Sequence, residues 1–197
     1  MKTGIFGGAF NPFHNGHLHL MLCYLDALQL DRILLIPTSV PPHKTGAYLA
    51  SGQDRLAMLS LVAKEYPQLT VSDMELRRSG KSYTYDTVCA LREQYPEDDF
   101  YLIIGSDQFF SFRSWYKATA LLQLVTVCTA ARNQGEYDRL TAFRRQYDDM
   151  VRCVVSDFEV LPLSSTEIRN KIKNGEAVTD CVPPAVANYI KEHGLYV

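Results

Sequence analysis

The sequence predicts a single-domain α/β protein with a doubly wound parallel sheet, spanning residues 1–197. Short runs of consecutive apolar residues, typical of buried parallel strands, alternate with stretches that repeat apolar residues every three or four positions, as helices do. No internal repeat, low-complexity tract or long Pro/Gly/Ser linker divides the chain. Ligands of such a sheet are expected at the carboxyl ends of its strands.

The first twenty residues give the order strand, glycine turn, helix. An apolar run at Ile5 and Phe6 stops at Gly7 and Gly8, where the missing Cβ atoms permit a close approach of the backbone to another group or a positive φ. A helical register follows it at Leu18, Met21, Leu22, Leu25 and Leu28.

His14 and His17 stand in or just before the first turn of this helix. A helix N-terminus favours phosphate through its unpaired N–H groups and its dipole, imidazoles can donate to phosphate oxygens, and Gly16 would let a nucleotide approach between them. Two other interpretations are a helix cap and a metal site completed by His19. A metal site is disfavoured because His19 points elsewhere on a helix and no cysteine or carboxylate stands nearby.

Further strands are predicted by the apolar runs at 32–36, 69–71, 100–104 and 124–128, with a weaker one at 151–155. Pro37 and Gly105, like Gly7, mark strand ends, so chemistry is expected just after each. The stretch 135–150 predicts a surface helix with one buried stripe, and with Arg144 and Arg145 on its solvated face. The stripe consists of Tyr137, Leu140, Phe143 and Tyr147.

Helix starts are indicated by capping residues. Ser51 begins a capped helix, and Thr84 is the expected N-cap of another. A final helix is expected to begin at Pro183 or Pro184 and to end before Gly194.

Composition restricts the class of protein. With 47% hydrophobic and 21% charged residues, the chain is predicted to be a soluble globular protein. A net charge of −2 disfavours nucleic acid as a partner and favours a small anion. Five scattered cysteines, with no signal-like segment and no run of about eighteen apolar residues, predict reduced thiols, a cytoplasmic location and no membrane partner. A homo-oligomer is possible, and the residues do not decide it.

The stretch from Gly7 to His17 resembles the signature of the nucleotidyltransferase superfamily, whose (His/Thr)-x-Gly-His motif serves adenylyl and cytidylyl transfer. The resemblance implies a Rossmann-like fold. Later segments are similar to those of the bacterial nicotinate-mononucleotide adenylyltransferases, and the likeness extends to the C-terminal residues 186–196.

Lys44 follows a proline-stiffened loop after the second strand. From the residues alone a solvated lysine is favoured. The string Pro-Pro-His-Lys resembles the same segment of that family, where the lysine faces phosphate, and this implies that Lys44 is a ligand.

Two segments resemble the family's mononucleotide site. The Ser-Tyr-Thr-x-Asp-Thr string implies that Thr84 and Tyr85 hold the nicotinate carboxylate, mostly through their backbone, although a simple capped helix would also explain these residues. Gly105 and Asp107 follow the strongest strand, and Trp115 lies eight residues beyond Asp107. A sole tryptophan is usually a core residue, but the resemblance implies that it stacks on the pyridine ring.

The segment around Ser165, Thr166 and Arg169 predicts a capped helix N-terminus able to bind an anion. A cation on a first helical turn is unfavourable unless an anion is present, so Arg169 supports this interpretation. The Ser-Ser-Thr-x-Ile-Arg string resembles the superfamily's second signature, which holds the β- and γ-phosphates of ATP.

The resemblance implies that ATP and nicotinate mononucleotide react to give deamido-NAD and pyrophosphate, with Mg²⁺ carried by ATP and no metal-ligating residues. His14 and His17 are the expected catalytic residues. The expected ATP ligands are Gly7, Gly8, Phe10, His14, Gly16, His17, Lys44, Gly105, Ser165, Thr166 and Arg169. The expected mononucleotide ligands are Thr84, Tyr85, Asp107, Trp115, Tyr116 and Lys44. The alternatives are another transferase of the superfamily, such as phosphopantetheine adenylyltransferase, and a non-catalytic nucleotide sensor.

Overall fold

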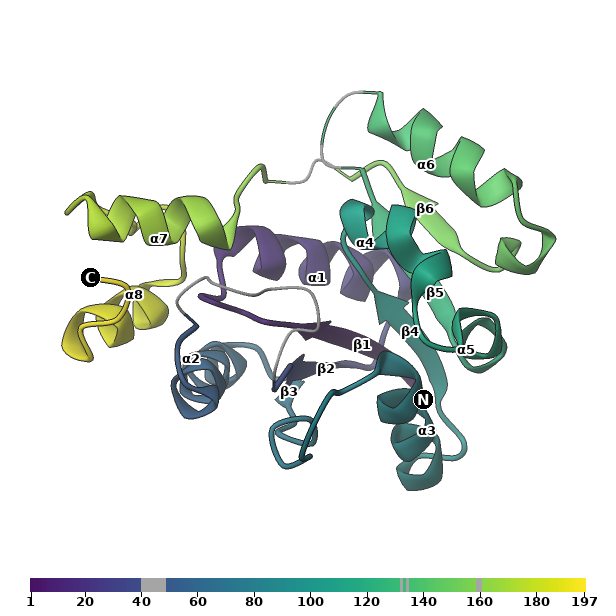
Figure 1. Ribbon diagram of the computed structural model, residues 1–197, viewed down its shortest axis with the longest axis horizontal. Coiled ribbons are helices and arrows are strands. Elements are labelled where there is room, and N and C mark those ends of the chain that lie inside the picture. The colour runs from purple at the N-terminus through teal and green to yellow at the C-terminus, as the bar shows by residue number, and fades with distance from the viewer. Residues whose placement is uncertain (40–48, 132, 134, 159–160) are drawn as a thin grey trace.

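A computed structural model describes residues 1–39, 49–131, 133, 135–158 and 161–197 (Figure 1). The described strands form one parallel sheet in the order β3-β2-β1-β4-β5-β6. The order reverses between β1 and β4, which is the switch point where doubly wound sheets bind ligands. The strands are β1 (Lys2–Gly8), β2 (Arg32–Pro37), β3 (Leu69–Val71), β4 (Asp99–Ile103), β5 (Thr126–Ala130) and β6 (Val154–Ser156).

Helices cover both faces of this sheet (Figure 1). They are α1 (Asn15–Leu28), α2 (Gly52–Glu65), α3 (Thr84–Gln94), α4 (Ser106–Ser111), α5 (Ala118–Leu124), α6 (Glu136–Arg145), α7 (Ser165–Lys173) and α8 (Pro184–Glu192), with short 3₁₀ turns η1 (Phe112–Ser114) and η2 (Asp148–Met150). The predicted doubly wound α/β fold is therefore confirmed. No helix in the described part of the chain is long and apolar enough to cross a membrane.

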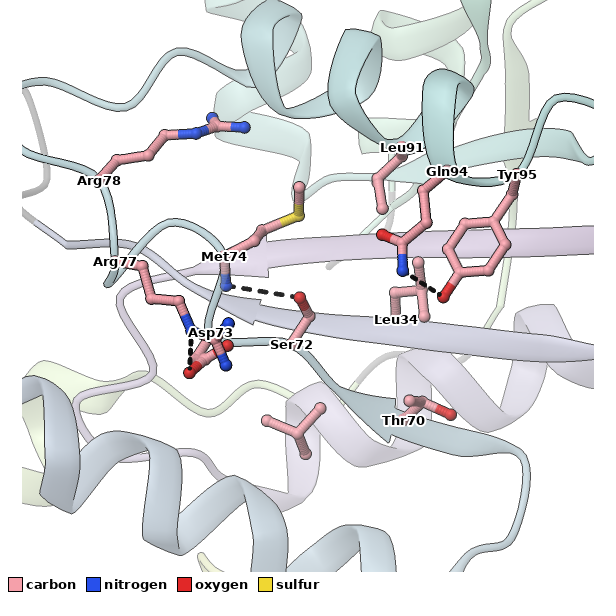
Figure 2. A pocket seen from close by; sticks show the side chains of 11 residues that line it. Leu34, Thr70, Ser72, Asp73, Met74, Arg77, Arg78, Leu91, Gln94 and Tyr95 are labelled. Atoms are coloured by element: carbon pink, nitrogen blue, oxygen red, sulfur yellow. Dashed lines mark hydrogen bonds and ion pairs between the residues drawn. The ribbon is translucent and has the colours of Figure 1, made fainter.

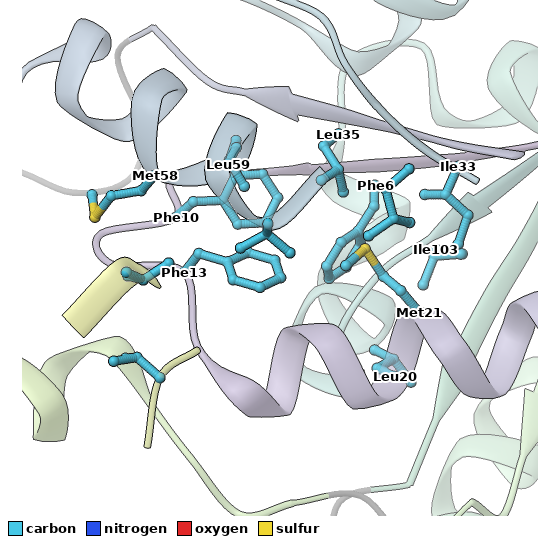
Figure 3. Packing of buried hydrophobic residues seen from close by; sticks show 14 of the residues in the cluster. Phe6, Phe10, Phe13, Leu20, Met21, Ile33, Leu35, Met58, Leu59 and Ile103 are labelled. Carbon is cyan, nitrogen blue, oxygen red and sulfur yellow. The ribbon is translucent and has the colours of Figure 1, made fainter. Parts of the chain in front are cut away.

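Side chains of successive strand residues point to opposite faces and form two hydrophobic cores. Ile33 and Leu35 of β2 face the core shared with α1, α2 and α8, which Figure 3 shows together with Phe6, Phe10 and Phe13. Leu34 and Ile36 face the core shared with α3, α4 and α5. Burial on both faces explains why the strands read as continuous apolar runs.

Two predicted strands are shifted in the structure. The run at 124–128 was expected to be a strand throughout, but α5 extends to Leu124 and β5 begins at Thr126. The last residues of α5 are apolar because they pack on the sheet, so the apolar run in the sequence begins before the strand does. The strand expected at 151–155 is β6, Val154–Ser156, since Val151 is exposed. The predicted strands at 32–36 and 69–71 are confirmed.

Four details of the predicted helices are wrong. Thr84 is the first residue of α3 and not its N-cap, which is Tyr83 without a side-chain cap bond. The helix in 135–150 ends at Arg145, and Tyr137 is exposed instead of lying in the buried stripe. Arg144 donates to the Cys153 carbonyl at 2.9 Å, so it does not simply face solvent.

The capped starts of two other helices are confirmed. The Ser51 hydroxyl accepts from the Asp54 N–H at the start of α2, and Pro183 is the N-cap of α8. These starts follow from local chemistry, namely a hydroxyl acceptor and a proline that needs no N–H partner.

At the amino end of the sheet, the carboxylate of Asp98 accepts hydrogen bonds from three groups. Its carboxylate accepts from Thr3 Oγ1 at 2.6 Å, from Arg32 at 2.8 Å and from the N-terminal ammonium at 3.3 Å. Burial raises the pKa of Asp98, but these three donors outweigh it, so the pKa lies below its ordinary value. This cluster lies at the end of the sheet opposite to the predicted ligand site.

Candidate active site

The β1–α1 turn begins at the carboxyl end of β1, beside the switch point. β1 runs through Gly8, and neither Gly7 nor Gly8 adopts a positive φ; Phe10 does, at 46°. An added Cβ on Gly8 would come within 3.3 Å of the Phe10 ring, a tight contact that the ring would have to relieve by a small shift. Of the two reasons expected for these glycines, positive φ does not apply, and close approach applies to Gly8 alone, since a Cβ on Gly7 would lie 3.9 Å from its nearest neighbour, the Ile36 carbonyl oxygen.

His14 and His17 form a reciprocal cap at the start of α1. The Nδ1 of His14 accepts from the N–H of His17 at 3.3 Å, and the Nδ1 of His17 accepts from the N–H of His14 at 3.2 Å. The rings stack with centroids 3.5 Å apart and an interplanar angle of 18°. The interpretation of His14 as a helix cap is thus confirmed.

This cap also fixes the histidine tautomers. An Nδ1 that accepts an N–H cannot carry a proton, so the neutral form of each ring carries its proton on Nε2. Each imidazole therefore presents Nε2 as a donor in a fixed orientation. Capping and donation to a phosphate are compatible because they use different ring nitrogens.

The ring of His17 is held by a cluster of phenylalanines. Its centroid lies 5.8 Å from Phe6 and 5.4 Å from each of Phe10 and Phe13. Phe10 is only 3% exposed, so its side chain belongs to the core and only its backbone could serve the predicted ATP contact. Close packing against these three rings limits the rotamers that the His17 side chain can adopt.

Gly16 serves protein packing. A Cβ added there would lie 3.1 Å from His14 Nδ1 and 3.2 Å from the Leu161 carbonyl oxygen. The space that the glycine provides is therefore filled by protein atoms on that side. Its contact with ATP stays a prediction.

The N-terminus of α7 docks directly on this turn. Ser164 is its N-cap, Ser165 Oγ donates to the Pro12 carbonyl at 3.0 Å, and Arg169 donates to the Asn11 carbonyl at 2.8 Å and to Thr166 Oγ1 at 3.2 Å. Segments more than 150 residues apart in the sequence thus meet, and two helix N-termini lie in one site. The carbonyl of Asn11 is one partner of the Arg169 cation, which sequence reasoning did not foresee.

Asn11 is a further residue that the sequence analysis missed. Its Oδ1 accepts from the Ala50 N–H at 3.0 Å and from the Tyr196 hydroxyl at 2.9 Å. The turn is therefore tied to the start of α2 and to the C-terminus. Its position inside the Gly7–His17 motif was the only available signal.

Two of the residues expected for the mononucleotide, Tyr85 and Tyr116, pack against each other at the start of α3. The Tyr116 ring lies 4.6 Å from that of Tyr83 and 6.2 Å from that of Tyr85, and Trp115 packs on Phe112 at 5.3 Å while staying partly exposed. These contacts join the first turn of α3, where Thr84 lies, to the segment before α5 (Figure 1).

Lys117 was not predicted. It has a positive φ of 52°, and its Nζ lies 4.5 Å from the centroid of the Tyr85 ring and 5.1 Å from that of Tyr116. It adds a cation to a cluster expected to bind a carboxylate. Its place directly after Trp115 and Tyr116 was the only signal in the sequence.

Gly105 and Asp107 begin α4 at the carboxyl end of β4, as expected. Gly105 is the N-cap with a φ of −69°, and Asp107 is exposed in the first turn. Ser106 between them is fully buried, and its hydroxyl has no hydrogen-bond partner among the residues that the structure describes. Lys44, the remaining predicted ligand, lies outside the described residues.

None of the predicted ligands that the structure describes lines a separate cavity of about 490 Å³ between β3 and α3 (Figure 2). Its walls carry Arg77, paired with Asp73 at 2.7 Å, and Gln94, which donates to Tyr95 at 3.1 Å. In the described part of the chain, no three His, Cys, Asp or Glu residues gather as metal ligands would.

The cytidylyltransferase-like family matches residues 5–171 of this chain. A "Probable nicotinate-nucleotide adenylyltransferase" of Neisseria meningitidis serogroup B is 40% identical over 202 residues, covering 99% of this chain and 98% of that one. A protein of the same name from Clostridium tetani is 34% identical over 197 residues, covering 99% and 98%. The chain belongs to the nicotinate-nucleotide adenylyltransferase family.

The family's fold agrees with that of a solved structure. The Plasmodium falciparum nicotinic acid mononucleotide adenylyltransferase complexed with NaAD superposes with a TM-score of 0.83 over 100% of this chain and 98% of that one, at 20% identity. At that identity the likeness shows the fold alone. The predicted resemblance to the family and the Rossmann-like fold are thereby confirmed.

Proposed function

We propose that this protein transfers the adenylyl group of ATP to nicotinate mononucleotide, giving deamido-NAD and pyrophosphate. Membership in the family supports this reaction. The structural observation that carries it is the reciprocal cap of His14 and His17, which uses the Nδ1 of each ring and so makes Nε2 the protonated nitrogen, at a helix N-terminus beside that of α7.

In the reaction, a 5′-phosphate oxygen of the mononucleotide forms a bond to the α-phosphorus of ATP. The bond from that phosphorus to the bridging α,β oxygen breaks, and its electron pair leaves with pyrophosphate. The attacking phosphate is already an anion near pH 7, so the step needs no general base. Catalysis then depends on aligning two polyanions and on stabilising the charge that develops.

The residues divide this work by position. His14 and His17 donate to phosphate oxygens of ATP, while Ser165, Thr166 and Arg169 hold its β- and γ-phosphates at the start of α7, with Lys44 and backbone of Gly7, Gly8, Phe10, Gly16 and Gly105 completing the ATP contacts. Hydrogen bonds from Ser165 and Arg169 to the turn at 11–12 support this arrangement, because they fix the two groups relative to each other.

The acceptor is held by the aromatic cluster. Trp115 stacks on the pyridine ring, Tyr116 and Asp107 contact the mononucleotide, and the N–H groups of Thr84 and Tyr85 bind the nicotinate carboxylate. The partial exposure of Trp115 and the cation of Lys117 over Tyr85 support an anionic aromatic acceptor better than phosphopantetheine. They also argue against a sensor, which needs no acceptor site.

Mg²⁺ enters, in this proposal, as part of the ATP substrate. Mg²⁺ commonly binds substrate phosphates and water with only one or two carboxylates, so it needs no cage of acidic residues, and the described residues form none. A cytoplasmic enzyme working on these small molecules, without nucleic acid or membrane, also fits the five free cysteines.

The test is pyrophosphate release from ATP and Mg²⁺, with nicotinate mononucleotide, nicotinamide mononucleotide or phosphopantetheine offered separately. We expect strong release with the nicotinate form. Release only with phosphopantetheine would reassign the acceptor, and release with none would contradict the proposed reaction.

A further inference from the structure

Arg55 is buried in the first turns of α2 with an exposed fraction of 1%. Its guanidinium donates to the carbonyl of Ala50 at 3.1 Å, of Ala9 at 2.9 Å and of Thr38 at 2.8 Å, and more weakly to that of Ser39 at 3.4 Å. Among the described residues, no carboxylate lies within ion-pair distance of it. A buried cation held only by backbone carbonyls is costly, which indicates a specific role.

The three carbonyls closest to the guanidinium, those of Ala50, Ala9 and Thr38, lie in segments around the predicted phosphate site. Ala9 lies between the Gly7-Gly8 pair and His14, Thr38 follows β2 at its carboxyl end, and Ala50 directly precedes the α2 cap. The planar guanidinium reaches all three because its donors point in different directions, which an ammonium cannot reproduce. Arg55 thus fixes the β1–α1 turn against the segment that follows β2.

The bonds also fix the direction of peptide dipoles. In a planar trans peptide the N–H points opposite to the C=O. Because the carbonyls of Ala9 and Thr38 point to the guanidinium, the N–H groups of Phe10 and Ser39 point away from it. Each of the two segments thereby turns one backbone N–H group away from the guanidinium, and oriented backbone N–H groups can bind an anion.

We propose that Arg55 is a positioning residue for the phosphates of ATP, which it serves by holding the peptide groups 9–10 and 38–39 with their N–H sides toward the nucleotide. This inference rests on the proposed function for the identity of the anion. The positive charge of Arg55 also favours an anion nearby, because the carbonyls that accept its hydrogen bonds carry no net charge. Burial lowers the pKa of Arg55, but a guanidinium remains protonated at neutral pH.

The inference is tested by measuring the affinity of wild type, Arg55→Lys and Arg55→Met for ATP and for adenosine, by calorimetric titration with competition where binding is weak. The control is Arg32→Lys, since Arg32 is also partly buried but bonds Thr3 and Asp98 at the opposite end of the sheet. We expect ATP to bind at least about tenfold more weakly to Arg55→Lys, with adenosine within about threefold and both lysine variants equally folded.

Equal weakening of ATP and adenosine, or unchanged ATP affinity in a folded Arg55→Lys, would overturn the inference. Loss of folding in both Arg55 variants would also overturn it, since the role would then be structural. Pyrophosphate release by the wild type is measured separately, so a wild type that binds ATP but forms no dinucleotide contradicts the proposed function and not the role of Arg55.

Discussion

Replacing His14 by asparagine separates the capping role of this residue from its proposed role in catalysis. Asparagine is among the best N-cap residues, so its Oδ1 can accept from the His17 N–H in place of Nδ1. The loss of the stacked ring costs about 0.5–1.5 kcal/mol, and the better cap offsets part of it. The free energy of unfolding is therefore expected to stay within about 1 kcal/mol of wild type.

Turnover is expected to respond very differently. Removing one preorganised donor from a developing oxyanion commonly costs about 100-fold to 1,000-fold in kcat. The Nε2 donor of His14 is lost in His14→Asn, whereas the helix start survives. Pyrophosphate release at saturating ATP and nicotinate mononucleotide should therefore fall by about two orders of magnitude or more, while urea unfolding changes little.

A matched control tests whether loss of a cap alone affects turnover. Ser51 caps α2 by accepting from the Asp54 N–H at 3.0 Å, and Ser51→Ala should cost about 1 kcal/mol of stability with kcat unchanged. If His14→Asn keeps turnover within about threefold of wild type, His14 is a cap only and the proposed catalytic role is wrong.

Two further predictions concern the acceptor site and the stability of the sheet. Trp115→Ala should weaken the binding of nicotinate mononucleotide about tenfold because stacking is lost, and Trp115→Phe should weaken it less. The affinity for ATP should stay within about twofold in both variants, and calorimetry measures both affinities. Unchanged affinity of Trp115→Ala for the mononucleotide would show that Trp115 is only a core residue. Asp98→Asn should lower the unfolding free energy by about 2–3 kcal/mol at pH 7, with the exposed Asp99→Asn as control. Since the folded pKa of Asp98 is below the unfolded value, its contribution exists above the unfolded pKa and is lost as pH falls through the folded pKa, so the two proteins should converge in acid unfolding. A constant difference at all pH values would contradict this assignment.

The sequence was informative where local chemistry decides the structure. The apolar run at 33–36 forms a strand because burial on both faces demands apolar residues at successive positions, and Ser51 caps α2 because a hydroxyl accepts from an N–H three residues on. The boundary at Leu124 was missed because a helix that packs on a sheet is itself apolar.

Contacts between distant segments could not be predicted from local pattern. Arg55 directly follows Gln53 and Asp54 at the start of α2, and its role depends on the carbonyls of Thr38 and Ala9, which lie 17 and 46 residues away. Lys117 likewise acquires its role through the ring of Tyr85. The family motif identified His14 and His17 correctly as neighbours of one helix start, but the hydrogen bond from the backbone of each to the ring of the other follows only from the folded structure.

Alignment of two polyanions requires that the groups holding them keep a fixed separation. In this fold the two helix N-termini are joined by direct hydrogen bonds, from Ser165 to Pro12 and from Arg169 to Asn11, and not only through the sheet. Asn11 in turn accepts from Ala50 and Tyr196. A displacement of α7 would therefore move the β1–α1 turn that precedes His14, because the carbonyls of Asn11 and Pro12 accept hydrogen bonds from the first turns of α7. The precision of the site thus rests on backbone groups that no motif describes.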